Sequence, residues 1–389
     1  MDIEIENIIL YIDDAVRYDY SVDRLSKIGQ TYKSIAASLH TSPSFASILT
    51  GQHVPNHGLT AFNYRTEGDL FSIFDISGYN TAISSKVALN DNIAKLFPGT
   101  ARSELSDMSP PFVWVERGPG GHAPYGQHDY ESFESLDQSG ADYLRSNAGD
   151  IKKLKSDYEQ GIQRSISHFE RIIQEVEERG LSESTLIIYT SDHGELLGEY
   201  GLISHNHIAC PELVYVPTTF VHPQLDDGNS SDLFRNVDIV PTILDYLDID
   251  IDIELDGQPL QEQDSKLVGY NHYITKFYGL PGKEFLNRET MSVWDQGGGH
   301  VFSNTSKIQS VFIYLALLVK SPIGTHIRRT GEYSKSLSKF LPGWETYGEP
   351  SFSIDEANRI IKGIERRGRS QQVSLDADTQ EQLKDLGYM

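Results

Sequence analysis

Residues 184–201, "STLIIYTSDHGELLGEYG", join an apolar run to a group of ionisable side chains. The run "LIIY" has the composition of a strand that is buried on both faces of a sheet. Asp192, His193 and Glu195 follow it directly. Burying these ionisable groups at the end of a core strand is unfavourable unless other groups compensate. The stretch therefore predicts either a capped turn or a functional site at the carboxyl end of a buried strand.

Other short apolar runs of the same kind occur along the chain, at residues 8–12, 81–83, 112–115 and 218–221. Together with residues 186–189 they are expected to form buried parallel strands. Long helical patterns lie between them. The clearest covers residues 151–179, where apolar side chains recur every third or fourth position and Gly180 follows as a C-terminal glycine. Strands that alternate with helices predict an α/β fold with a doubly wound, mostly parallel sheet.

The pattern changes in the last third of the chain. The Gly-rich segment "WDQGGGHVF" is followed by an apolar run at residues 311–319, a basic segment and a final helical pattern. We expect a catalytic α/β domain at residues 1–290 and a smaller α+β subdomain at residues 291–389. The apolar run is much shorter than the roughly 20 residues that cross a membrane.

The charge is strongly negative and spread along the whole chain. Among 389 residues, 56 acidic side chains oppose 33 basic ones, for a net charge of −23. Such a surface repels phosphates and argues against nucleic acid as a partner. It fits a halophilic cytoplasm, where salt screens the repulsion, and an acidic mesophilic protein is the alternative. Cys210 is the single cysteine, so no intrachain disulfide is expected. The N-terminus lacks the basic region of a signal peptide, which predicts a cytoplasmic protein.

Two pairs of candidate metal ligands follow two of the predicted strands. Asp13 and Asp14 follow residues 8–12, and Asp192 and His193 follow residues 186–189. Ligands of open α/β sheets bind at the carboxyl ends of the strands, so the pairs are expected to meet. Asp13 and Asp14 alone would also suit a helix N-cap, but the second pair favours a divalent metal site. The histidine favours manganese, zinc or magnesium over calcium. Glu195 is expected to brace the turn.

A hydroxyl-rich segment, "HTSPSFASILTG", begins at His40 and ends at Gly51. Thr41 and Ser42 precede Pro43, a residue favoured at the start of a helix. A hydroxyl there faces free backbone N–H groups, which stabilise an oxyanion, and a nearby dication would stabilise an alkoxide further. An ordinary Ser/Thr N-cap is the alternative.

Taken in order, these segments resemble the sulfatase family of the alkaline phosphatase superfamily. The resemblance rests on "NIILYIDDAVRYD", "TSPSFASILTG", "GYNTAISSK", "GGHAPY", "TLIIYTSDHGELLGEYGL", "VDIVPTILDYL" and "LKDLGY". It implies that Lys86 contacts the substrate and balances charge on the non-bridging oxygens, and that His122 is catalytic. The ester oxygen would leave with a proton from His122 or His205. His205 also stands where sulfatases place a second substrate-binding lysine, and His207 is the alternative to His205.

Two departures bear on the chemistry. The resemblance places Thr41 where sulfatases carry Cys or Ser, and Phe45 where they carry Arg. Threonine cannot be converted into formylglycine, so no formylglycine is expected here. Phosphodiesterases and phosphoglycerol transferases of the same superfamily use threonine directly. The resemblance therefore implies a metal-dependent hydrolase that cleaves sulfate or phosphate esters through a hydroxyl nucleophile, with phosphoester chemistry favoured.

A second hypothesis is a sulfatase-like protein without turnover that binds an anionic glycan or lipid headgroup. Phe45 supports it, whereas the two pairs of metal ligands oppose it. The expected substrate is a small-molecule, glycan or lipid ester with an anionic group. The apolar and basic residues 311–339 also suggest weak contact with a membrane surface. The alternative for that segment is a helix that packs on the main domain. The sequence predicts no oligomeric state.

Overall fold

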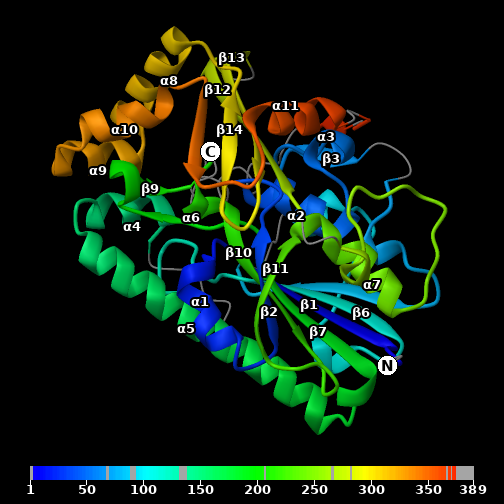
Figure 1. Ribbon diagram of the computed structural model, residues 1–389. Coiled ribbons are helices and arrows are strands. Elements are labelled where there is room, and N and C mark those ends of the chain that lie inside the picture. Colours follow the sequence, from blue (N-terminus) through cyan, green and yellow to red (C-terminus); the bar gives the residue numbers. More distant parts are fainter. Residues whose placement is uncertain are drawn as a thin grey trace.

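The computed structural model describes residues 3–66, 70–87, 93–130, 138–205, 207–263, 267–280, 283–364, 367–368 and 370–373. A large sheet forms its centre, with the strand order β11-β2-β10-β7-β1-β6-β4-β5 (Figure 1). Its strands are β1 (Asn7–Asp13), β2 (Gln30–Ile35), β4 (Asn80–Ser85), β5 (Ala101–Arg102), β6 (Phe112–Gly118), β7 (Thr185–Ser191), β10 (Tyr215–Val221) and β11 (Gly228–Arg235).

The centre of the sheet is parallel, as predicted. β1 lies between β6 and β7 and runs parallel to both, and every residue of β1 is buried. β10 was expected to be parallel as well, and that prediction is wrong: β10 is antiparallel to both β7 and β2. The described residues between β7 and β10 form no long helix that could carry the chain back across the sheet, so β10 returns beside β7 in the opposite direction.

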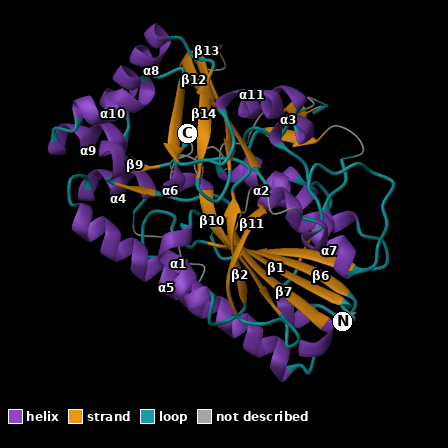
Figure 2. Ribbon diagram, in the orientation of Figure 1, coloured by secondary structure: helices purple, strands orange, loops and turns teal. Residues whose placement is uncertain are grey.

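Helices cover both faces of the sheet (Figure 2). The long helix α5 (Ile151–Glu178) packs on one face, beside α1 (Tyr18–Leu25) and α4 (Gly140–Asn147). The other face is covered by α2 (Thr41–Thr50) and α7 (Ile239–Tyr246). The predicted helix at residues 151–179 is confirmed, and Gly180 follows it with a φ of +68°. These layers confirm the doubly wound α/β fold class.

The smaller subdomain is an antiparallel sheet with helices, as expected. Its sheet contains β12 (Gly269–Leu280), β13 (Lys283–Trp294), β14 (Gly298–Ser303) and β15 (Trp344–Gly348). Its helices are α8 (Lys307–Lys320), α9 (Pro322–Thr330), α10 (Tyr333–Phe340) and α11 (Ile354–Gly363).

The predicted domain boundary at residue 290 falls inside β13, so it needs correction. β12 and β13 pair along most of their length, and the second sheet therefore begins at Gly269. This sheet is also bonded to the main domain: the amide of His272 donates to the carbonyl of Ala37 (2.9 Å). Ser38 donates its hydroxyl to the carbonyl of His272 (2.8 Å). The segment "LKDLGY" lies outside the described residues.

Acidification is expected to destabilise the fold through buried histidines, of which His57 in α3 (Val54–His57) is the clearest. Its Nδ1 accepts the amide of Leu59 and its Nε2 lies 3.0 Å from the hydroxyl of Ser47. Burial, with a smaller contribution from His53, lowers the pKa of His57 to about 3. The unfolded chain binds this proton near its ordinary pKa of about 6.5, so folded stability is full above that pH and falls below it.

Between pH 6.5 and 5, His57 alone is expected to remove about 2 kcal/mol from the free energy of unfolding. Denaturant titrations at a series of pH values measure this loss. The matched variant is His57→Gln, which keeps a donor for Ser47 and does not titrate. It should lose less stability than the wild type over the same pH range. An equal loss in both proteins would show that His57 does not cause the acid sensitivity.

Candidate functional site

The ends of β1 and β7 bring the two predicted pairs of metal ligands together. The strands are adjacent, with Asp13 opposite Ser191, so the residues that follow each strand meet at one edge of the sheet. Asp192 accepts the amide of Ala15 on its Oδ1 (2.9 Å). Asp14, Asp192 and His193 are fully buried, and each offers one ligand atom within 4.8 Å of the others. We call these three residues the metal-type group.

The chemistry of this group fits a divalent cation. His193 donates its Nδ1–H to the carbonyl of Gly194 (2.9 Å), which leaves Nε2 to face the carboxylates. That Nε2 lies 3.4 Å from Oδ2 of Asp192, and this oxygen accepts no hydrogen bond. Burial raises the pKa of Asp192 to about 7. A buried carboxylate oxygen without a donor beside an imidazole nitrogen is an environment that a metal ion would stabilise.

Asp13 is not among the three residues whose ligand atoms lie within 4.8 Å of one another, although the sequence paired it with Asp14. Successive side chains of a strand point to opposite faces, and Asp13 lies on the face covered by α5. Its Oδ2 accepts the hydroxyl of Tyr189 (2.6 Å), while its Oδ1 accepts no hydrogen bond. Gly120, with a φ of +40°, passes so close that a Cβ there would lie 2.6 Å from this Oδ1. A ligand role for Asp13 stays a prediction.

Thr41 is the first residue of α2 and is fully buried beside the metal-type group. Its Oγ1 lies 3.4 Å from Nε2 of His193. The hydroxyl of Ser44 donates to the carbonyl of Asp192 (2.5 Å), which fixes the first turn of α2 against the end of β7. The helix ends at Gly51, which has a positive φ of 67°. The site thus combines a hydroxyl, a helix N-terminus and buried ligand atoms.

Arg117 is a site residue that the sequence did not single out. It is the penultimate residue of β6, is 2% exposed and places its guanidinium 2.6 Å from Oδ2 of Asp14. Burial acts to raise the pKa of Asp14, but His122 and Arg117 hold it below its usual range. The Arg117 guanidinium also lies 5.6 Å from the ring centroid of Phe45. A cation from β6 therefore packs on the phenylalanine that replaces the arginine of sulfatases.

Two of the predicted histidines lie at the same edge of the sheet. His205, which follows β9 (Ile203–Ser204), has its ring centroid 4.3 Å from that of His193 and 6.1 Å from that of His122. Glu195 places Oε2 3.3 Å from Nδ1 of His205, and its Oε1 accepts the amide of Leu196. Glu195 therefore braces the turn, as the sequence suggested, and also holds His205. Burial lowers the pKa of both His122 and His205.

The structure does not bring His207 and Lys86 to this group. The ring of His207 packs near Phe340 of α10, with centroids 6.3 Å apart. Lys86, just after β4, pairs with Glu104 (3.0 Å) and Glu116 (3.6 Å). Glu116 and Arg117 are consecutive residues of β6, so their side chains point to opposite faces of the sheet. Lys86 lies with Glu116 on the α5 face. The metal-type group lies with Arg117 on the other face.

His40, the N-cap of α2, was also missed. Its Nδ1 lies 3.2 Å from the hydroxyl of Ser42. Burial, with smaller contributions from the nearby imidazoles of His205 and His193, lowers the pKa of His40 to about 3. Its ring stacks with that of Tyr273 from β12, with centroids 6.1 Å apart. The second sheet therefore borders the site. No spacing or motif in the sequence distinguishes His40 from an ordinary residue before a helix.

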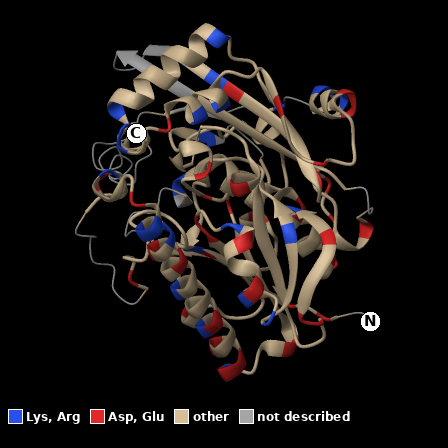
Figure 3. Cartoon of the chain, turned by 60° about the vertical axis from the view of Figure 1, so that its left-hand side comes forward, with Lys and Arg blue, Asp and Glu red and all other residues tan. Residues whose placement is uncertain are grey.

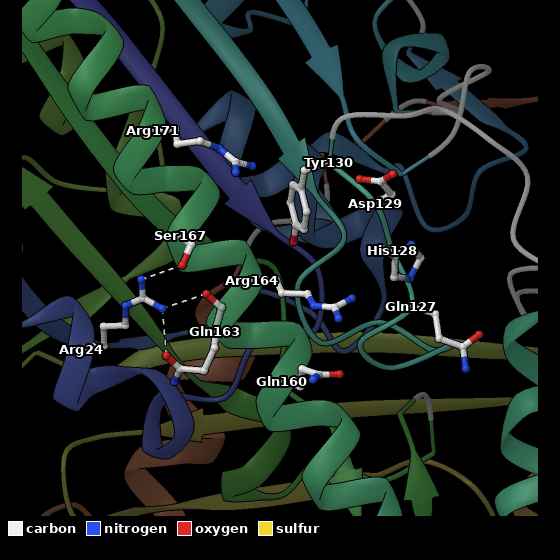
Figure 4. A pocket seen from close by; sticks show the side chains of 10 residues that line it. All are labelled: Arg24, Gln127, His128, Asp129, Tyr130, Gln160, Gln163, Arg164, Ser167 and Arg171. Carbon is white, nitrogen blue, oxygen red and sulfur yellow. Dashed lines mark hydrogen bonds between the residues drawn. The ribbon is translucent and has the colours of Figure 1, made fainter.

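A pocket of about 680 Å³ lies on the far side of α5 (Figure 4). Its walls are Arg24 of α1, residues 127–130 and one face of α5. None of the residues of the metal-type group lines it. Arg24 is already bonded to Gln163 and Ser167, as the dashed lines show. The lining residue His128 lies next to His122, with ring centroids 6.5 Å apart, so the pocket adjoins the candidate site on the side of this histidine.

Comparisons with known proteins agree with the fold. The family model described as Sulfatase matches residues 94–249. A relative from Haloferax volcanii, named low-salt glycan biosynthesis sulfotransferase Agl7, is 29% identical, with 99% of this chain and 96% of the relative covered. The N-acetylglucosamine-6-O-sulfatase of Bacteroides thetaiotaomicron is 27% identical over 30% of this chain and 24% of its own length.

Two solved structures share the fold at low sequence identity. The phosphonate monoester hydrolase of Agrobacterium radiobacter superposes with a TM-score of 0.60 at 15% identity, covering 86% of this chain and 95% of the other. The 2-O GAG sulfatase BT1596 superposes with a TM-score of 0.62 at 12% identity, covering 92% and 90%. Residues 94–249 therefore match the Sulfatase family, and the chain as a whole shares the fold of sulfatases and phosphonate monoester hydrolases.

Proposed function

We propose that this protein is a metal-dependent enzyme that cleaves a sulfate or phosphate ester with Thr41 as its nucleophile. The observation that carries the proposal is the position of the Thr41 hydroxyl, 3.4 Å from Nε2 of His193 at the N-terminus of α2. A hydroxyl in this place has ligand atoms on one side and backbone N–H groups on the other. Both stabilise an alkoxide and the anionic group that it attacks.

Asp14, Asp192 and His193 would hold the ion. Asp13, the fourth ligand that the sequence predicts, would join them only if its carboxylate turned from the α5 face toward the other three residues. A bound dication lowers the pKa of a hydroxyl beside it and offsets the negative charge of the ester oxygens. The imidazole ligand favours manganese, zinc or magnesium over calcium. We assign to Arg117 the charge balance that the resemblance implied for Lys86, because Arg117 contacts Asp14 and Lys86 is paired with Glu104 and Glu116.

The Thr41 hydroxyl would first lose its proton to solvent, so that the nucleophile is the alkoxide. The covalent step then forms a bond from Oγ1 of Thr41 to sulfur or phosphorus while the bond to the ester oxygen breaks, and protonated His122 or His205 gives its proton to the leaving oxygen. A water or an acceptor hydroxyl next attacks the threonine ester and gives its proton back to the same histidine, and Thr41 leaves as the alkoxide again. Burial keeps both imidazoles neutral in the resting protein, and an anionic substrate would raise their pKa values.

Phosphoesters are the first candidate substrates, because water can attack a phosphothreonine in line. Transfer of a sulfuryl group to a glycan hydroxyl is the second. It is favoured by the full-length similarity to the Haloferax volcanii protein that is named a sulfotransferase of glycan biosynthesis. In that reaction a sugar hydroxyl takes the place of water. The binding protein without turnover stays the alternative, and the buried group of ligand atoms beside Thr41 opposes it.

Turnover assays on matched aryl substrates test the proposal. The protein is freed of metal, reloaded with one ion at a time and offered a phosphate diester, a phosphate monoester and a sulfate ester, each with and without a sugar acceptor. Metal-dependent phosphoester cleavage without an acceptor is expected. Sulfate-ester cleavage only with the acceptor would favour the transferase. No turnover in any condition, with metal bound, would overturn the enzyme proposal.

A further inference from the structure

α8 exposes an apolar face that nothing in the described structure covers. Five large side chains of this helix are between 38 and 78% exposed and follow helical spacing. They are Ile308, Val311, Phe312, Leu315 and Val319, and together we call them the apolar face of α8. The opposite side of the helix is buried through Ile313, Tyr314 and Leu317. The alternative prediction was a helix that packs on the main domain. The helix does pack through one side, but its other apolar side stays exposed.

The charge around this face differs from that of the rest of the chain. Residues 296–331 contain no Asp or Glu, although the protein has 56 acidic residues. Lys307 and Lys320, at the two ends of α8, and Arg328 in α9 are exposed. Among the described residues, no carboxylate pairs with any of these three cations. In Figure 3, α8 is tan with blue at its ends and without red.

This combination selects one kind of partner. A second copy that presented the same face would bring lysines against lysines. An acidic protein surface would pair with the lysines but would leave the large apolar side chains without an apolar partner. An anionic lipid surface satisfies both features, because acyl chains accept the apolar face and headgroups accept the cations. We propose that the apolar face of α8 docks on an anionic lipid bilayer, with the helix lying in the plane of the interface.

The geometry limits this contact to the surface. At 14 residues α8 is about 21 Å long, shorter than the roughly 30 Å hydrocarbon core. No single helix in the described residues has the length and hydropathy of a membrane span. α8 and α9 reach that composition only as a pair bent by 88°.

The docking face lies one helix away from the candidate site. α8 packs on α10 through the hydroxyl of Tyr314, which donates to the carbonyl of Tyr333 (2.9 Å). Phe340 at the end of α10 contacts His207, two residues beyond His205. A bilayer under α8 would thus support the segment that carries His205. The proposed docking does not depend on the proposed chemistry.

Flotation of the full-length protein with vesicles tests the proposal. One vesicle contains equal parts of phosphatidylcholine and phosphatidylglycerol, and the other contains phosphatidylcholine alone. The wild type is expected to float with the first at the lowest salt concentration that keeps it folded. Phe312→Ser with Leu315→Ser should lower its partitioning by roughly tenfold or more. Lys307→Gln with Lys320→Gln should lower it by at least about fivefold on the anionic vesicle only.

Ile253→Ser is the matched control, because Ile253 is an exposed apolar residue far from α8 in the sequence. It should float like the wild type. Circular dichroism should show the same fold for every variant, since all the altered side chains are exposed. Wild-type protein that floats with neither vesicle, or a Phe312/Leu315 variant that floats equally well, would overturn the proposal. A dimer that dissociates on the same substitution would assign the face to a second copy instead.

Discussion

Thr41→Ala is expected to lower kcat by at least about 1,000-fold, because it removes the atom that attacks the ester. Thr41→Ser keeps a hydroxyl on the same backbone and should stay within about tenfold of the wild type. Both side chains fit the fully buried position at the start of α2, so the fold and the metal affinity should be retained. Single-turnover kinetics with each variant measure the chemical step separately from product release.

Ser42→Ala provides the matched control. Ser42 is also a fully buried hydroxyl in the first turn of α2, and it lies 3.2 Å from Nδ1 of His40. If the hydroxyls only cap the helix, the two alanine variants should lose similar, small amounts of activity. If Thr41 is the nucleophile, only Thr41→Ala should lose turnover, and acid-quenched wild-type protein should carry a phosphoryl or sulfuryl group on Thr41. Full activity in Thr41→Ala would show that another atom attacks.

The parts of the fold that could be predicted are those whose burial leaves a continuous apolar pattern. β1, β6 and β7 are buried at every position, and their apolar runs showed in the sequence. β2 is harder to recognise, because its sequence "QTYKSI" mixes polar residues with few apolar ones. The direction of β10 could not be predicted from its composition, since an apolar run is the same whether its neighbour is parallel or antiparallel.

The site was predictable where it depends on adjacent strand ends and unpredictable where it depends on the direction of a side chain. Asp14 and Asp192 meet because β1 and β7 are neighbours. Asp13 points to the other face, which follows from strand alternation but needs the exact end of β1. Arg117 was missed because a charged residue near the end of an apolar run indicates a strand end more often than a buried ion pair. The roles of Asp14, Asp192 and Arg117 in binding a metal ion or a substrate stay predictions.

Metal binding is expected to reverse the sign of the effect of Asp192→Asn on stability. Without metal, burial disfavours the charged form of Asp192 and raises its pKa to about 7, with a smaller contribution from Asp14, so a neutral side chain at this position removes that cost. The asparagine oxygen can still accept the amides of Ala15 and His193, which now bond Oδ1 of Asp192. The metal-free variant should therefore be at least as stable as the metal-free wild type.

With an ion present at 100 times its Kd, the wild type should gain about 2.7 kcal/mol in its free energy of unfolding, because the ion binds the folded chain only. Asp192→Asn removes a ligand charge and should lose most of that gain. Thermal unfolding with chelator, and then with manganese, zinc, magnesium or calcium, gives both comparisons. Asp238→Asn is the control, since Asp238 is equally buried but pairs with Arg235 (2.6 Å). It should destabilise the protein by the same amount with and without the ion. A wild type that no divalent ion stabilises would mean that the group of Asp14, Asp192 and His193 is not a metal site.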